Sequence, residues 1–277
     1  MNRVNPHQEQ FGFVTIAQNT EECDYVRLAY VQALSIKLSM PGSKYAIITN
    51  NEVPDEYIEA FDYVILLENP AEWAQANEWQ VFYLTPFKET IKLEADLLFT
   101  RDCSHWLDAL RLREVVLSMH CKNVYGEVVT NSAHRTLFAQ NNLPDVYNGM
   151  MYFRYGQTSA NFFRTAEALF ANWDSVKSSL KGCDDPLPTT DIIYAVTALL
   201  VGVEDVTLPM DFFNFVHLKS TINKWPEGNW DDMVISEINV PMVRINNLNQ
   251  YFPVHYHYKD WITNDRLEQY RSAYRSI

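Results

Sequence analysis

Two acidic residues interrupt an apolar run within the segment from Thr85 to Phe99. Glu94 and Asp96 stand two positions apart, so in an extended backbone both carboxylates point to the same side. Two like charges aimed together inside an apolar run are costly unless a cation or hydrogen-bond donors meet them. A divalent cation held by oxygen ligands would explain the pair, and a strand edge whose acids face water is the alternative.

Histidines in two later segments are candidates for completing such a site. His217 lies in a run rich in Phe and Val, where it is either a metal ligand or a packed core residue. His255 and His257 alternate in the segment VHYHYKDW, so they share one face of a strand and could bind the metal in place of His217. Packing among the neighbouring aromatic residues is the alternative for this pair. Lys259, two residues after His257, is a candidate for binding phosphate.

The composition predicts a folded protein with a sizeable core. The chain has 277 residues, of which 47% are hydrophobic, and a formal net charge of −13. This acidity argues against general coating of nucleic acid, which requires basic surface, although it leaves room for a local basic groove. Only 8 glycines occur, and no Gly-x-Gly is present, so a P-loop and a dinucleotide-binding fingerprint are both excluded.

The cysteines and the apolar runs indicate the compartment. The four cysteines are widely spaced without a C-x-x-C pair, which favours reduced, packed thiols. Residues 1–10 are polar and lack the apolar core of a signal peptide. The longest apolar run, 192–203, is shorter than the roughly 20 residues of a membrane span. We therefore expect a cytoplasmic protein with no membrane partner.

The alternation of apolar runs and helical periodicity predicts an α/β fold: a mostly parallel, Rossmann-like central sheet flanked by helices. No internal repeat or linker is evident, so we expect residues 1–277 to form a single domain. The expected strands are 11–17, 45–49, 63–67, 90–99, 150–154, 206–208 and 212–218. The expected helices are 24–40, 159–173, 191–201 and 265–276.

Several short motifs occur along the chain in a definite order. They are Ala17–Thr20, Thr85-Pro86-Phe87 with Leu93–Asp96, Tyr147–Phe153, Thr190-Asp191, and Leu208-Pro209 followed by Phe213-Asn214, His217 and Lys224-Trp225. In these motifs the chain resembles nucleotide-sugar glycosyltransferases of the GT-A fold, in particular glycosyltransferase family 8 and related enzymes, phage-encoded ones included. The acidic segment corresponds to the family's Asp-x-Asp motif, with Glu94 in place of the first Asp.

The resemblance implies a metal site. Asp96 would bind the metal directly, Glu94 would contact the metal or the ribose, and His217 would complete the protein ligands. A site rich in oxygen with one imidazole fits manganese better than magnesium.

The resemblance also implies which residues contact the substrate. Asp191 and Asn148 would lie at the reacting face of the donor sugar, with Gly149 beside them. Lys224 would neutralise the diphosphate. The first loop and the helix that follows it would hold the base and ribose through Ala17, Gln18, Thr20 and Tyr25.

The activity implied is metal-dependent transfer of a sugar from a nucleotide-diphosphate sugar to an acceptor hydroxyl, with retention of configuration. Residues 11–105 would bind the nucleotide sugar, and residues 106–277 would supply acceptor and metal residues. The acceptor would be a saccharide or, for a phage enzyme in the host cytoplasm, a hydroxymethylated DNA base. A nucleotidyltransferase and a non-catalytic nucleotide-sugar-binding protein are the alternatives. The Gly-Ser element expected of the former is absent from the segment directly ahead of Glu94 and Asp96.

Overall fold

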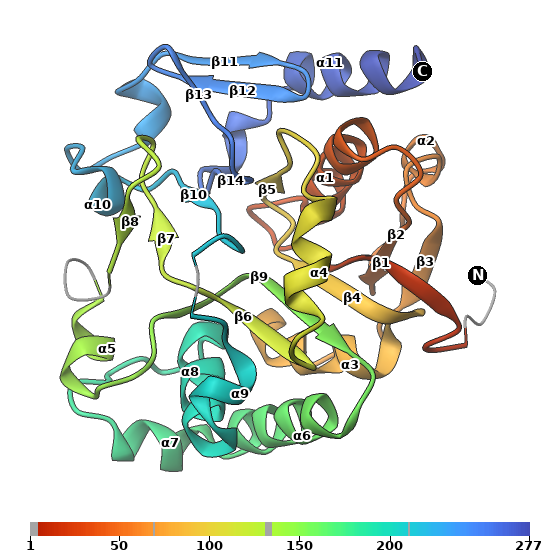
Figure 1. Ribbon diagram of the computed structural model, residues 1–277. Helices are drawn as coiled ribbons and strands as arrows, with labels where there is room; N and C mark the ends of the chain where they lie inside the picture. Colours follow the sequence, from red (N-terminus) through yellow and green to blue (C-terminus); the bar gives the residue numbers. More distant parts are fainter. Residues whose placement is uncertain (1–4, 69, 131–134, 210) are drawn as a thin grey trace.

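A six-stranded sheet forms the middle layer of the computed structural model, which describes residues 5–68, 70–130, 135–209 and 211–277 (Figure 1). The strand order is β3-β2-β1-β4-β9-β6; β1 to β4 are parallel, and β9 runs antiparallel to both of its neighbours. The strands are β1 (Glu9–Ile16), β2 (Tyr45–Thr49), β3 (Tyr63–Leu66), β4 (Phe87–Leu93), β6 (Val115–Met119) and β9 (Val146–Arg154). The predicted mostly parallel central sheet is confirmed.

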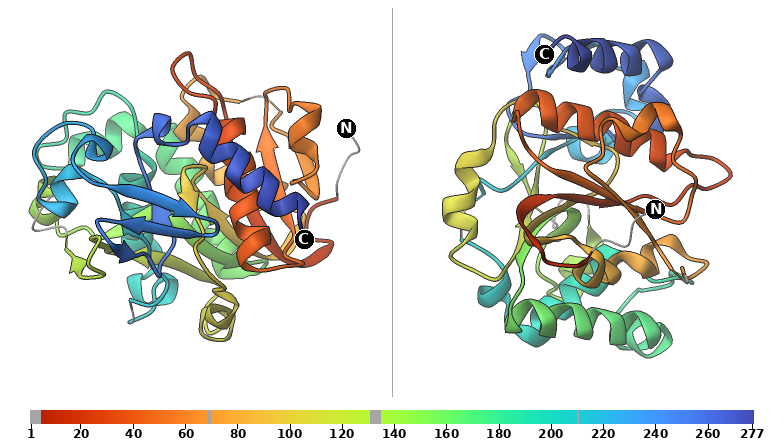
Figure 2. Two further views of the ribbon diagram at one scale, coloured as in Figure 1. Left: turned by 90° about the horizontal axis from the view of Figure 1, so that it is seen from above. Right: turned by 90° about the vertical axis from the view of Figure 1, so that its right-hand side faces the viewer.

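Helices cover both faces of this sheet (Figure 2). On one face lie α1 (Tyr25–Ser39) and, packed on it, α11 (Asn264–Arg275). On the other lie α6 (Gln157–Ala171) and α8 (Thr190–Val201). Alternate residues of β1 enter two separate cores, with Phe13 facing α1 and Val14 facing α6 and α8. Burial on both faces explains why the strand reads as a continuous apolar run.

Two smaller sheets complete the described structure. The first has the order β5-β14-β10-β7-β8 and the second is the antiparallel meander β11-β12-β13. Their bounds are β5 (Leu97–Leu98), β7 (Cys121–Lys122), β8 (Val128–Val129), β10 (Val216–His217), β11 (Ser236–Asn239), β12 (Met242–Ile245), β13 (Leu248–Asn249) and β14 (Val254–His255). Because β14 pairs with both β5 and β10, the first of these sheets joins three distant segments beside the end of β4.

Short helices connect these elements. They are α2 (Asp55–Ile58), α3 (Val81–Leu84), α4 (Leu107–Leu110), α5 (Thr136–Gln140), α7 (Trp173–Ser179), α9 (Val203–Val206) and α10 (Ser220–Asn223), with 3₁₀ turns at Ala74–Gln80, Ser104–Trp106, Trp230–Asp232 and Lys259–Trp261. In the part of the chain that the structure describes, no helix combines the length and the apolarity needed to span a membrane.

Three predicted strands differ from the structure. The strand predicted over 90–99 is two strands, because β4 ends at Leu93 and a turn follows, in which the side chain of Gln32 donates hydrogen bonds to the carbonyls of Glu94 and Leu97. Residues 203–206 form α9 where a strand was predicted over 206–208. Of the predicted strand 212–218 only β10 forms, since the side chain of Asn214 accepts the hydrogen bond of the next backbone amide.

Candidate active site

A cleft of about 560 Å³ lies where the ends of β1 and β4 meet β10 and β14. The structure brings eight of the predicted site residues to its wall: Gln18, Thr20, Tyr25, Glu94, Asp96, Gly149, Asp191 and His217. Ala17 is buried at the end of β1, and Asn148 is buried behind Glu94. Lys224 is exposed after α10 and does not line this cleft, whereas Lys259 does.

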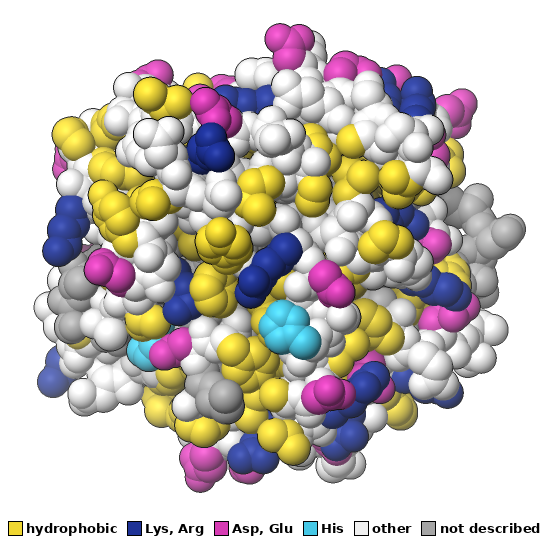
Figure 3. Space-filling model, turned by 45° about the horizontal axis from the view of Figure 1, so that its top comes forward, with side chains coloured by type: hydrophobic (Ala, Val, Ile, Leu, Met, Phe, Trp, Pro, Cys, Tyr) yellow, Lys and Arg dark blue, Asp and Glu magenta, His cyan; other side chains and the backbone are white. Residues whose placement is uncertain are grey.

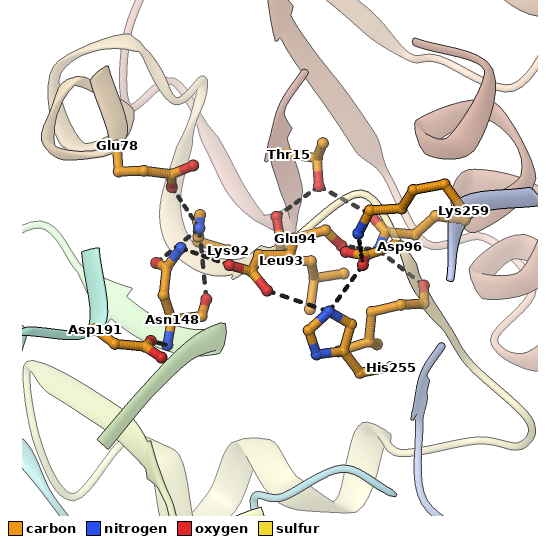
Figure 4. A network of polar contacts seen from close by, with 12 residues as sticks. Thr15, Glu78, Lys92, Leu93, Glu94, Asp96, Asn148, Asp191, His255 and Lys259 are labelled. Atoms are coloured by element: carbon orange, nitrogen blue, oxygen red, sulfur yellow. Dashed lines mark hydrogen bonds and ion pairs between the residues drawn. The ribbon is translucent and has the colours of Figure 1, made fainter. Parts of the chain in front are cut away.

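Asp96 is the best-anchored acid of the site (Figure 4). Its carboxylate is 3% exposed, lies 2.9 Å from Nε2 of His255, and also accepts a hydrogen bond from Nζ of Lys259. Burial alone would raise the pKa of Asp96, but the charges of His255 and Lys259 outweigh burial and hold that pKa well below its usual value. Asp96 is therefore ionised at neutral pH.

Glu94 lies between His255 and Asn148. One of its oxygens, Oε1, accepts a hydrogen bond of 3.0 Å from Nδ2 of Asn148, and the other, Oε2, lies 3.4 Å from Nε2 of His255. Burial raises the pKa of Glu94. The two acids thus stand in the turn after β4, with His255 between their carboxylates.

The histidines of β10 and β14 lie side by side. The strands pair in parallel with His217 opposite His255, and the two rings stack at 4.5 Å. Ligand atoms of Asp96, His255 and His257 all lie within 4.8 Å of one another, a group that does not include His217. Both metal-binding alternatives from the sequence therefore lie at one end of the cleft.

The three histidines differ in protonation. Burial and the neighbouring charge of His255 lower the pKa of His217 well below its usual value, and they lower the pKa of His257 to about 4. Within the described residues, the Nδ1 atoms of His217 and His255 are buried without a hydrogen-bond partner. Burial alone would lower the pKa of His255, but the charge and hydrogen bond of Asp96 outweigh burial and raise that pKa, so this imidazole would give up its proton on binding a metal. The unpartnered ring nitrogens, the neutral His257 and the ionised Asp96 form a donor set that fits a divalent transition metal.

Asp191 lies at the opposite end of the cleft. Its Oδ1 accepts a hydrogen bond of 2.7 Å from the backbone amide of Asn148, and its Oδ2 lies 3.1 Å from the guanidinium of Arg135. Arg135 in turn lies 4.2 Å above the ring of Tyr147. The position of the Asp191 carboxylate is therefore fixed by a strand amide and a stacked cation.

Sequence reasoning missed two charged residues at this site, Glu78 and Lys92, and did not place Arg135 beside the predicted site residues. Glu78 and Arg135 line the cleft, and Lys92 is fully buried beneath it. The available signal was a lysine between Ile91 and Leu93 in an apolar strand, because a lysine is almost never buried without a partner.

No family model and no curated protein sequence matches this chain. Solved structures do match. The galactosyltransferase LgtC, in complex with donor and acceptor sugar analogs, is similar with a TM-score of 0.56 and 12% identity over 96% of each chain. The WbbM bifunctional glycosyltransferase is similar with a TM-score of 0.53 and 13% identity. The match covers 99% of this chain and 50% of WbbM. The glycosyltransferase GlyE of Streptococcus pneumoniae is similar with a TM-score of 0.51 and 10% identity, over 96% of this chain and 60% of GlyE. The protein therefore has the α/β fold of the GT-A glycosyltransferases.

Proposed function

We propose that this protein is a metal-dependent glycosyltransferase that moves a sugar from a nucleotide-diphosphate sugar to an acceptor hydroxyl, with retention of configuration. The observation that carries the proposal is the meeting of Glu94 and Asp96 with His255, His257 and Lys259 in one cleft. LgtC, whose structure holds donor and acceptor sugar analogs, has the same fold over 96% of its chain.

The leaving diphosphate sets the chemical requirement. Negative charge develops on it as the glycosidic bond breaks, and a divalent cation together with a lysine stabilises that charge. Asp96, His255 and His257 would hold the cation, with His217 as the alternative imidazole ligand, and the mixed oxygen and nitrogen donors favour manganese over magnesium. Lys259 lies at the same end and takes the phosphate-neutralising role that the resemblance gave to Lys224.

The opposite end of the cleft suits the donor sugar. Asp191 and Glu94 offer two carboxylates there, and the buried Asn148 holds both by hydrogen bonds from behind. A sugar hydroxyl or the reacting face of the anomeric carbon would meet them there. We assign the base and ribose of the donor's nucleotide to the loop that contains Gln18 and Thr20. We also propose that the chain forms a single domain.

The acceptor has two candidate classes, a saccharide and a hydroxymethylated base of phage DNA. Figure 3 shows acidic and basic side chains interspersed over the described surface of one face of the molecule, rather than a continuous basic band. Together with the net charge of −13, this favours a saccharide, since DNA binding needs phosphate-neutralising cations along its path.

A donor screen tests the proposal. Melting temperature is measured with a panel of nucleotide-diphosphate sugars, with and without manganese, because a ligand of the native state raises stability by mass action. Each donor that binds is then incubated with saccharides and with hydroxymethylated DNA, and products are identified by mass spectrometry. Transfer or hydrolysis of a donor supports the proposal. Binding without turnover indicates a non-catalytic protein, and pyrophosphate release from a nucleoside triphosphate indicates a nucleotidyltransferase.

A further inference from the structure

A buried ion pair lies beneath the cleft, outside the set of residues assigned above. Lys92, the second-last residue of β4, is 0% exposed, and its Nζ forms an ion pair with Oε2 of Glu78. The same Nζ donates a hydrogen bond of 2.8 Å to Oδ1 of Asn148 and lies 3.5 Å from the backbone carbonyl of that residue. Figure 4 shows the three side chains in a row that leads to Glu94.

The chemistry of this row allows Asn148 a single orientation. A lysine ammonium only donates hydrogen bonds, so the atom that meets Lys92 must be an acceptor. Asn148 lies between Lys92 and Glu94, so its oxygen faces Lys92 and its nitrogen is left to donate to Glu94. The contacts are 2.8 Å on the lysine side and 3.0 Å on the carboxylate side. The cation therefore decides which group Asn148 presents to Glu94.

Asn148 is also the residue that joins the two ends of the site. Its backbone amide holds Asp191 at 2.7 Å, while its side chain holds Glu94. A change in the position of this residue would move two carboxylates that face the donor from different sides.

We propose that Lys92 is a positioning residue: through the amide of Asn148 it fixes the Glu94 carboxylate in the geometry needed for sugar transfer. Glu78 balances its charge, so that the cation can remain buried. The catalytic part of this inference rests on the proposed glycosyltransferase function. The alternative is that Lys92 and Glu78 are a structural ion pair whose only effect is on folding.

A double variant separates these two roles. Lys92→Met alone leaves a buried carboxylate unpaired and is expected to lower the melting temperature, whereas Lys92→Met combined with Glu78→Gln removes both charges and recovers most of it. Glu78→Gln alone is the baseline, because the lysine nitrogen, charged or neutral, can still donate its hydrogen bond to Oδ1 of Asn148. If Lys92 positions the site, the double variant has a kcat about 10- to 100-fold below that baseline with KM for the donor changed less than about threefold, since a misplaced reacting group costs up to about a hundredfold.

If the double variant recovered both its melting temperature and the kcat of Glu78→Gln, the proposal would be overturned. A second readout does not depend on activity. The side-chain amide signal of Asn148, followed by NMR on protein labelled at asparagine and assigned with Asn148→Asp, should shift and lose protection from hydrogen exchange in the double variant but not in Glu78→Gln. An unchanged, protected signal would equally overturn the inference. If the wild-type protein turned over no donor, the proposed function would fail. The amide signal alone would then test whether Lys92 orients the side chain of Asn148.

Discussion

Replacing Asp96 by Asn removes the most deeply anchored carboxylate of the site. The buried His255 and the partly buried Lys259 bond to the same oxygen of Asp96, so the variant leaves Lys259 without its negative partner and His255 with Glu94 alone. Breaking a buried ion pair on one side costs about 3–5 kcal/mol. The asparagine oxygen still accepts one hydrogen bond, so we take the lower end, about 3 kcal/mol.

This free energy converts into a measurable change in melting temperature. The entropy of unfolding is about 2.1 cal/mol/K per residue, and the chain has 277 residues. A loss of 3 kcal/mol therefore lowers the melting temperature of the metal-free protein by about 5 °C. The variant should keep its fold, but donor turnover should fall at least about a thousandfold, because a carboxylate that holds the cation beside the leaving group is lost.

Scanning calorimetry with and without manganese, followed by a turnover assay, tests both parts. Glu237→Gln is the matched control: its ion pair with Arg244 spans 3.6 Å between side chains that are about half exposed, so its stability should change by less than about 0.5 kcal/mol. Manganese should raise the melting temperature of the wild type and of the control, but not that of Asp96→Asn. If Asp96→Asn retained the wild-type melting temperature, metal response and turnover, the assignment of this acid to the site would be wrong.

Three further predictions concern the cations of the site and a distant histidine. His255→Ala should raise the manganese dissociation constant at least about tenfold by titration calorimetry and His217→Ala by less than about threefold; the reverse order would restore His217 as the main ligand. Lys259→Met should weaken nucleoside-diphosphate binding about tenfold in the same assay, while Lys224→Met, which alters an exposed lysine outside the cleft, should leave it unchanged; equal effects would contradict this placement. A hydrogen bond to an aspartate raises the pKa of His120, so its contribution to stability is fully present below the unfolded pKa and is lost as the pH rises through the folded pKa. Urea unfolding should therefore show His120→Gln to be destabilising by roughly 1 kcal/mol at about pH 5.5 and by less at about pH 8.5, and a difference independent of pH would contradict the pairing.

Most of the central sheet could be predicted from the sequence because strands such as β2 are buried on both faces, whereas β6 was not predicted. Runs such as Tyr45–Thr49 are apolar throughout, and the helix from Tyr25 repeats its apolar residues at helical spacing before Pro41 and Gly42 end it. The strands β5, β10 and β14 have two residues each. No local pattern marks so short a strand, since it exists only through pairing with distant segments.

The same limit applies to the metal ligands. His217 and His255 lie opposite each other on paired strands, so both face the cleft and the sequence could not rank them. The order of motifs placed the closing His and Lys at His217 and Lys224, whereas the structure sets Lys259 against Asp96 and leaves Lys224 exposed. Only the register of β14 with β5 supplies that information.

The pairing of β5 with β14 also determines when the site can form during synthesis. Asp96 and His255 are separated by 159 residues along the chain. At a translation rate of about 5–20 residues per second, the histidine follows the acid by roughly 8–30 s. Over that interval Glu94 and Asp96 have neither His255 nor Lys259 to meet their charge, and closing so long a loop is a late step in folding. A ribosome-bound chain is therefore expected to have its parallel strands in place before Glu94 and Asp96 meet His255 and Lys259.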